Sequence, residues 1–291
     1  LVSEHHEPGR FVTFSGFEWA SNIYGHMNVI YAEEGNQLFY PFTPWAEDDT
    51  PARLYEQLDG ADALVIPHHS SWPVNNGEAV GGVDWDYYDP RLTRLVEVCS
   101  KHGVSEYLGC PGCLVNQARE GTVRSALARG YRLGFVGSTD THATRPGSWG
   151  IKGDLWTPHA GIAAVLADRL ERDSIFEALR QRRCYATTGA RMILDFTVAG
   201  SLMGSEITLP PEGEILVQGR VLGTAPVTHI ELVRGGEVIY RHAPASKQDA
   251  PSFEFRDRRA LQSGTHYYIR VMQEDGHQAF ASPVYVDPEG E

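Results

Sequence analysis

Residues 132–147 read Arg-Leu-Gly-Phe-Val-Gly-Ser-Thr-Asp-Thr-His-Ala-Thr-Arg-Pro-Gly, a short apolar run that ends in small residues and then in Asp140 and His142. Such a run is typical of a buried strand, and an Asp and a His two residues apart at its carboxyl end project to the same side. A carboxylate and an imidazole held in this way suit a divalent metal. The same pair also occurs on surfaces as a hydrogen-bonded pair, so the metal hypothesis depends on other strand ends that offer the same ligand types.

The start of the chain offers a second pair of such side chains. Residues 10–19 predict a strand that ends near Glu18, and residues 25–31 predict another that begins with His26. Glu18 stands between two aromatic residues, where an unpaired charge is costly, and this favours a bound cation or a hydrogen-bonded role. His26 alone is more simply a structural histidine, but across one turn the two side chains can converge on a single point.

A third strand, residues 61–70, ends in His68 and His69 after a helix expected over residues 51–60. Neighbouring strand residues face opposite sides, so only one of the two histidines should point into any given site. We favour His68 as the metal ligand and His69 as a group that supports the ligand or contacts the substrate. The Gly-rich, aromatic residues 71–89 follow as an anchored surface loop or as a wall of the substrate site.

A fourth strand is predicted over residues 92–100, and Glu97, His102 and Glu106 near its carboxyl end can face the same centre, although loops are generally rich in such residues. A helix expected over residues 121–130 then leads into the central strand. This alternation of strands and helices predicts parallel strands with functional groups gathered at their carboxyl ends.

The pattern changes near residue 190. Residues 158–183 predict helix, whereas residues 192–291 contain short alternating runs separated by Gly, Pro and Asp, as is typical of an antiparallel sandwich. We therefore expect two domains, residues 1–190 and residues 191–291.

The charge composition limits the classes of binding partner. With 25 Lys plus Arg against 38 Asp plus Glu, the net charge of -13 argues against a broad nucleic-acid footprint and against an anionic membrane surface. An anionic substrate would need a local positive centre, which a metal would supply. No apolar run approaches the roughly 20 residues of a membrane span. Leu1 in place of Met predicts that the natural amino terminus is missing, so the compartment stays open, and a homo-oligomer is compatible with this composition.

An ordered series of motifs resembles the later motifs of the PHP (polymerase and histidinol phosphatase) superfamily. The motifs are Gly16-Phe-Glu18, Gly25-His26, Ile66-Pro-His68-His69, Val96-Glu-Val98 and Gly137-Ser-Thr-Asp140-Thr-His142. Their wording, together with Ser100-Lys-His-Gly-Val-Ser-Glu106 and Tyr185-Ala-Thr-Thr-Gly-Ala-Arg191, is similar to the branch known as DUF3604 proteins. The resemblance covers about residues 10 to 200, and the ordered set is far more specific than any single motif.

The resemblance implies an α/β fold: an incomplete or distorted (β/α)7 PHP-type barrel, followed here by the small antiparallel β-sandwich. It implies a cluster of two or three divalent ions, commonly zinc, manganese or iron, that hydrolyses phosphate esters by acidifying a bridging water. By motif, Glu18 would bridge two metals, His26 and His68 would complete the second site, Asp140 would ligate the first metal and His142 the third.

Three further side chains are candidates for catalytic groups. Arg145 follows the metal motif closely and suits a phosphate clamp through its planar guanidinium, with a surface arginine as the equally weighted alternative. His69 and His102 are the other two candidates.

One departure from the family pattern matters. The His-x-His motif of the first barrel strands does not occur before Glu18. This predicts either a truncated piece of a longer protein or a natural short form, in which Glu18, His26 and His68 hold one metal.

The sequence thus predicts a metal-dependent hydrolase, most simply a phosphoesterase that acts on a small anionic phosphoester with one to three Zn, Mn or Fe ions. Two alternatives stay open. A metal-dependent amidase or lactonase would use the same activated water on a carbonyl group. A non-catalytic scaffold would bind a carbohydrate or a protein through the sandwich.

Overall fold

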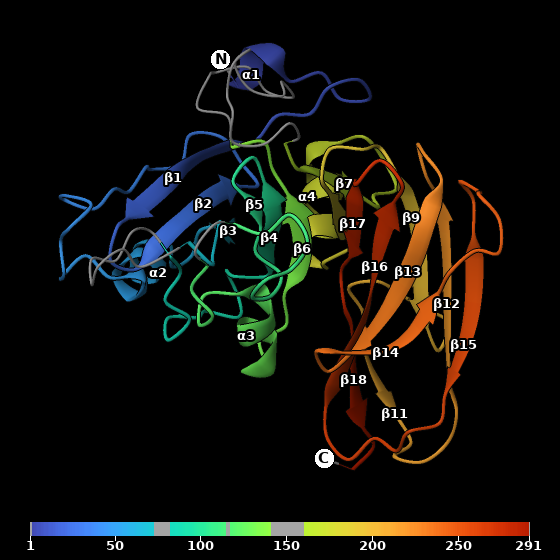
Figure 1. Cartoon of the computed structure of the whole chain (residues 1–291). Coiled ribbons are helices and arrows are strands. Elements are labelled where there is room, and N and C mark those ends of the chain that lie inside the picture. Colours follow the sequence, from blue (N-terminus) through green and yellow to red (C-terminus); the bar gives the residue numbers. More distant parts are fainter. Residues whose placement is uncertain (1, 73–81, 115–116, 141–159, 291) are drawn as a thin grey trace.

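The computed structural model describes residues 2–72, 82–114, 117–140 and 160–290. The N-terminal strands, blue to green in Figure 1, stand beside the orange and red strands of the C-terminal part. The helices within the described residues are α1 (Val2–His5), α2 (Pro51–Gln57), α3 (Val123–Ala128) and α4 (Arg172–Arg180). Across the described ranges, we find no helix whose length and hydropathy would let it span a bilayer.

The first three strands form an antiparallel sheet in the order β1 (Ser15–Ser21), β2 (Gly25–Tyr31) and β3 (Ala63–His68). The turn between β1 and β2 depends on Gly25, which adopts a left-handed φ of 96°. A Cβ atom at this position would lie 2.6 Å from the Cα atom of Val83, so only glycine fits the turn.

Side chains alternate along each strand, so the sheet has two different faces. One face is apolar throughout, whereas the other is apolar at Ile30, Leu64 and Ile66 and becomes polar toward the opposite end of the strands. The apolar face packs against α2, which begins with Pro51 after the capping hydroxyl of Thr50. Buried in this core are Phe17, Trp19, Met27, Val29, Tyr31, Leu54 and Leu58. The remaining face of the sheet carries Glu18, His26 and His68.

A second small sheet has the order β5 (Gly103–Val104), β4 (Leu95–Ser100) and β6 (Gly134–Gly137). Strands β4 and β6 are parallel, with α3 in the connection between them. Their carboxyl ends therefore lie at the same edge, where the chain continues toward His102 and Asp140.

Two larger sheets enclose the core of the C-terminal part. The smaller one runs β10 (Ser201–Leu202), β9 (Ile193–Val198), β12 (Ile215–Leu222) and β15 (Ser252–Asp257). The path of the larger one is β11 (Glu206–Leu209), β18 (Val284–Pro288), β16 (Thr265–Gln273), β17 (Gln278–Ala281), β8 (Cys184–Thr187) and β7 (Ile162–Val165), with β13 (Val227–Arg234) paired to β16 and β14 (Glu237–His242) paired to β13. The inward side chains of β9 and β12 alternate with outward polar ones, so the antiparallel sandwich expected here is present.

The predicted (β/α)7 barrel is wrong. The described residues are mostly strands in several sheets, largely antiparallel, with four short helices and no such barrel. A parallel barrel needs a helical crossover between successive strands, but the short turn that joins β1 to β2 can only make a hairpin. The helix predicted over residues 158–183 is also shorter, because residues 162–165 form β7 and α4 begins at Arg172.

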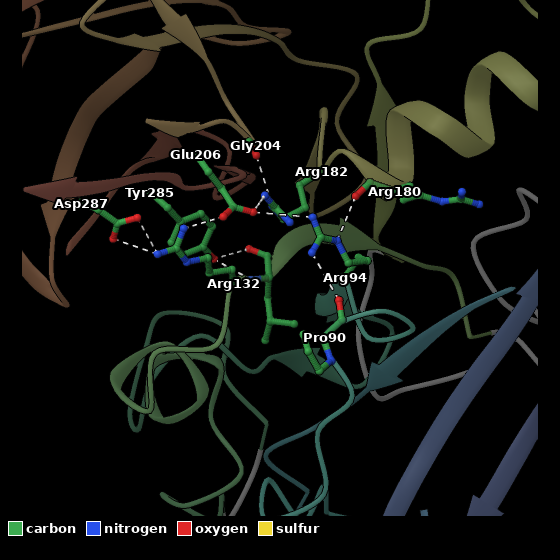
Figure 2. A network of polar contacts seen from close by, with 10 residues as sticks. Pro90, Arg94, Arg132, Arg180, Arg182, Gly204, Glu206, Tyr285 and Asp287 are labelled. Carbon is green, nitrogen blue, oxygen red and sulfur yellow. Dashed lines mark hydrogen bonds and ion pairs between the residues drawn. The ribbon is translucent and has the colours of Figure 1, made fainter. Parts of the chain in front are cut away.

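A polar network joins the N-terminal part to the sandwich (Figure 2). Arg94, Arg132 and Arg182 lie just before β4, β6 and β8, at the ends of these strands opposite to His102 and Asp140. All three contact Glu206 of β11. Arg132 also donates to both carboxylate oxygens of Asp287 on β18, at 2.8 and 2.7 Å. The network therefore fixes the amino-terminal ends of these strands against the C-terminal sheet. The larger C-terminal sheet also includes β7 and β8, which precede residue 191. The division of the chain into two domains at residue 190 stays a prediction.

Candidate metal centre

Glu18, His26 and His68 meet at the polar end of the mixed face of the first sheet. His26 and His68 are direct cross-strand partners, and Glu18 lies on the same face of β1. An oxygen of the Glu18 carboxylate lies 3.0 Å from Nδ1 of His26 and 3.4 Å from Nε2 of His68. Antiparallel pairing, not a shared strand end, therefore brings these three side chains together.

Asp140 extends this group toward the second sheet. Its Oδ2 atom lies 3.6 Å from Nδ1 of His68 and 2.9 Å from Nε2 of His102. His68 thus stands between two carboxylates, one from each side of the centre. The structure brings together Glu18, His26, His68 and Asp140, as the sequence predicts, and it places the predicted catalytic candidate His102 beside them.

His69 also turns its ring toward this centre, although strand alternation predicts that it should face away. Strand β3 ends at His68, and His69 adopts a left-handed φ of 34°, which interrupts the alternation. Its ring centroid lies 4.1 Å from that of His68 and 4.8 Å from that of His26. Possible ligand atoms of His26, His68 and His69 all lie within 4.8 Å of one another.

The left-handed turn at His69 is held by Glu97, which is 2% exposed in the middle of β4. The backbone N–H of His69 donates to Oε1 of Glu97 at 3.1 Å, and the hydroxyl of Ser138 donates to Oε2. Glu97 thereby ties the end of β3 to the end of β6. The sequence places Glu97 among three polar candidates, but its contact with a backbone N–H has no sequence signal.

The charges of the centre give it a negative potential. Burial alone would lower the pKa of His68, but the neighbouring carboxylates of Asp140 and Glu18 raise it to about 10. Burial alone would raise the pKa of Asp140, but the adjacent imidazoles of His102 and His68 hold it well below its usual range. The adjacent imidazoles of His26 and His68 hold the pKa of Glu18 below its usual range as well. The carboxylates that favour a proton on His68 would also attract a metal cation, which would take the place of that proton.

His69 is the uncharged member of the group. Burial, together with the charges of His68 and His26, lowers the pKa of His69 to about 2, so its ring is neutral at pH 7. Its Nδ1 atom is buried and has no hydrogen-bond partner in the described part of the chain. A neutral imidazole with an unpartnered buried nitrogen is a group that a metal ion would satisfy.

The donor set fits a single ion after a small adjustment. Two nitrogen ligands of a tetrahedral zinc, each at about 2.0–2.1 Å, lie roughly 3.4 Å apart. The ligand atoms of the three histidines lie up to 4.8 Å apart. Side-chain rotations that move these atoms by about 1 Å would bring them to the ligand spacing of a zinc ion. Histidine nitrogens and a carboxylate oxygen suit Zn, Mn or Fe and leave positions open for substrate.

Three predicted residues are not part of this group as described. His142 and Arg145 lie outside the described residues. Glu106 points into the protein interior, where it accepts hydrogen bonds from Tyr268 and from the Arg270 guanidinium at 2.6 Å each. Glu106 therefore belongs to a buried ion pair and not to the candidate centre.

The fold and this cluster define a β-rich protein with a carboxylate and histidine centre of metal-ligand type. Among known families, the sequence model described as "Protein of unknown function (DUF3604)" matches residues 1–94 and 151–210. These segments make up more than half of the chain, so the chain belongs to the DUF3604 family.

Curated relatives occur in Chlamydia. Proteins of Chlamydia muridarum and Chlamydia trachomatis, both named "Uncharacterized protein", are each 29% identical over 317 residues, which cover 98% of this chain and 48% of the relative. The chain spans about half the length of the curated relatives it matches.

Solved structures resemble only about a third of the chain. The fibronectin(III)-like modules of Clostridium thermocellum CbhA are 11% identical with a TM-score of 0.24, covering 33% of this chain and 95% of that one. CopC from Methylosinus trichosporium OB3b is 17% identical with a TM-score of 0.22, covering 35% of this chain and 97% of that one. These scores are too low to carry an argument about fold or function.

Proposed function

We propose that this chain is a metal-dependent hydrolase that acts on phosphoesters, with chemistry of the kind that the PHP superfamily carries out. The observation that supports the proposal most is the convergence of His26, His68 and His69, whose ligand atoms lie within 4.8 Å of one another beside Glu18. These four ligand groups come from three strands and a left-handed turn and are buried or half-buried. Without a bound cation, bringing such polar groups together out of water costs free energy.

Glu18, His26, His68 and His69 would hold one divalent ion. Such an ion would supply a positive centre for an anionic substrate in a chain of net charge -13, and it would acidify water at neutral pH. Histidines and a carboxylate leave room for substrate, unlike a closed site of four cysteines.

The remaining side chains would orient the ligands and move protons. Asp140 lies against both His68 and His102, so it fixes the orientation of the two rings. His102, held through Nε2 at 2.9 Å from Asp140, is the group placed to give a proton to a leaving oxygen or take one from water. Trp72 packs beside His102 and limits the access of water to its ring.

Metal titration of the chelator-treated protein is the first experiment. We expect uptake of Zn2+ or Mn2+ at about one ion per chain in calorimetry. Removal of one ligand by His26→Ala should weaken the affinity by at least about tenfold. His229→Ala removes a histidine of strand β13 in the sandwich and serves as the matched control, with unchanged affinity. Failure to take up either ion, or equal affinity in both variants, would contradict the metal site.

Hydrolysis assays then separate the substrate classes. With the bound ion in place, we expect cleavage of a phosphomonoester or a phosphodiester, and loss of cleavage when the ion is removed. Cleavage of amides or lactones alone would assign the same centre to carbonyl substrates. Metal uptake without hydrolysis of any of these would favour a binding protein.

A further inference from the structure

Trp72 lies directly against the candidate centre. Its ring centroid lies 4.8 Å from that of His69 and 4.5 Å from that of His102, in both cases edge to face. His69 is buried, whereas the indole of Trp72 is partly exposed. The indole therefore stands where the polar rings of the centre meet solvent.

Backbone contacts hold the main chain at Trp72, and the rings of His69 and His102 pack against its indole. The N–H group of Trp72 donates to the carbonyl of His69 at 2.9 Å, and the carbonyl of Ser71 accepts from the N–H group of Ala118 at 2.9 Å. A Cβ atom on Gly82 would approach the carbonyl oxygen of Trp72 to 2.5 Å, so the chain packs closely there. An aromatic ring held in place before a ligand arrives binds with a small loss of conformational freedom.

The position of the indole suits a flat ring on the substrate. On the side of the candidate centre, the indole has charged and polar neighbours. These neighbours offer no favourable contact to an apolar group of a substrate. The face of an indole stacks on aryl rings and nucleobases through dispersion and complementary quadrupoles. A phosphoester bound at the centre would extend its organic group from the phosphorus atom toward the surroundings, where Trp72 lies.

We infer that Trp72 is a specificity-determining residue that selects phosphoesters whose organic group carries a flat aromatic ring. This inference rests on the proposed function, because it takes the metal centre as the place where the phosphoryl group binds. It adds the class of the organic group, which the centre alone does not define.

Binding of non-hydrolysable phosphonates to the metal-loaded full chain tests this inference. The probes are methylphosphonate, cyclohexylphosphonate and phenylphosphonate, each titrated by calorimetry after metal content has been measured. We expect phenylphosphonate to bind about 5- to 100-fold more tightly than methylphosphonate, in line with one stacked ring. Cyclohexylphosphonate should fall well below phenylphosphonate, because it is apolar but has no aromatic face.

Two variants assign this preference to one side chain. Trp72→Leu keeps an apolar group but removes the aromatic face, so the ratio of phenyl to methyl affinity should fall to about one. Trp45→Leu removes a tryptophan that is 52% exposed on another loop and should keep the ratio of the parent.

Each outcome decides the inference. Equal affinity for all three probes in metal-loaded protein overturns the inference and leaves the proposed function standing. Equal affinity for the phenyl and cyclohexyl probes overturns it in favour of a simple apolar contact, and a ratio that survives Trp72→Leu removes Trp72 from the explanation. A chain that binds no metal ion overturns the proposed function and this inference together.

Discussion

Replacement of Glu97 tests how the fold positions the candidate centre. The carboxylate accepts from the N–H group of His69 at 3.1 Å and from the hydroxyl of Ser138, and it is 2% exposed. Glu97→Ala leaves the N–H group of His69 buried without a partner, at a cost of about 1–3 kcal/mol, and leaves a cavity in β4. Glu97→Gln keeps an acceptor oxygen for His69, and its amide can donate to Ser138.

The two variants should therefore differ in both stability and metal affinity. At about 2–4 °C per kcal/mol, Glu97→Ala should lower the thermal midpoint by several degrees, whereas Glu97→Gln should change it less. Because the carboxylate holds the left-handed turn that aims the ring of His69, Glu97→Ala should also weaken Zn2+ or Mn2+ binding by about 10- to 100-fold. Glu97→Gln should stay within a few-fold of the parent.

Differential scanning fluorimetry of the metal-free protein and calorimetric metal titration measure the two effects separately. Parent-like metal affinity in Glu97→Ala would refute the claim that this carboxylate aims His69. Equal losses in the Ala and Gln variants would show that the charge of Glu97, and not its hydrogen bonds, is what the centre requires.

Two further predictions concern the interior of the protein. Arg270→Met should destabilise the protein by about 3–5 kcal/mol in urea unfolding, because it leaves the 1% exposed carboxylate of Glu106 buried without its charge partner. Arg256→Met breaks an exposed ion pair and should leave the free energy of unfolding almost unchanged. Similar losses in the two variants would contradict the buried ion pair. Burial, with a smaller effect from Arg124, lowers the pKa of His266 to about 4. Protons therefore bind preferentially to the unfolded chain, and the free energy of unfolding should fall as the pH drops from about 6.5 to 4. His266→Phe keeps a ring beside Tyr268, and its free energy of unfolding should lose about 3 kcal/mol less than that of the parent over this range; parallel pH profiles would contradict the assignment.

Local structure was predictable where the hydrophobic pattern agrees with the turn and capping residues at the ends of an element. Residues 25–31 form β2 as predicted, and the helix expected over residues 51–60 is present as α2 over Pro51–Gln57. In both segments the residues that determine the element are neighbours in sequence. The short alternating runs expected after residue 192 form strands for the same reason, and β9 (Ile193–Val198) is one of them.

The arrangement of the strands was not predictable in the same way. Strand alternation and helical periodicity are the same whether a strand pairs in parallel or antiparallel, so the pattern of residues 10–70 could not distinguish a barrel from a hairpin sheet. The short loop before Gly25 was the available signal, because a turn of that length cannot hold a helical crossover.

The orientation of His69 depends on where its strand ends. The alternation rule holds only within a strand, and a sequence does not show at which residue the strand ends. Here β3 ends one residue earlier than the rule assumes, and the buried carboxylate of Glu97, 28 positions along the chain, holds the turn that follows. A contact between residues so far apart leaves no periodic trace in either segment. The ring of His69 thus turns toward those of His26 and His68, and a carboxylate on a strand of the neighbouring sheet holds it there.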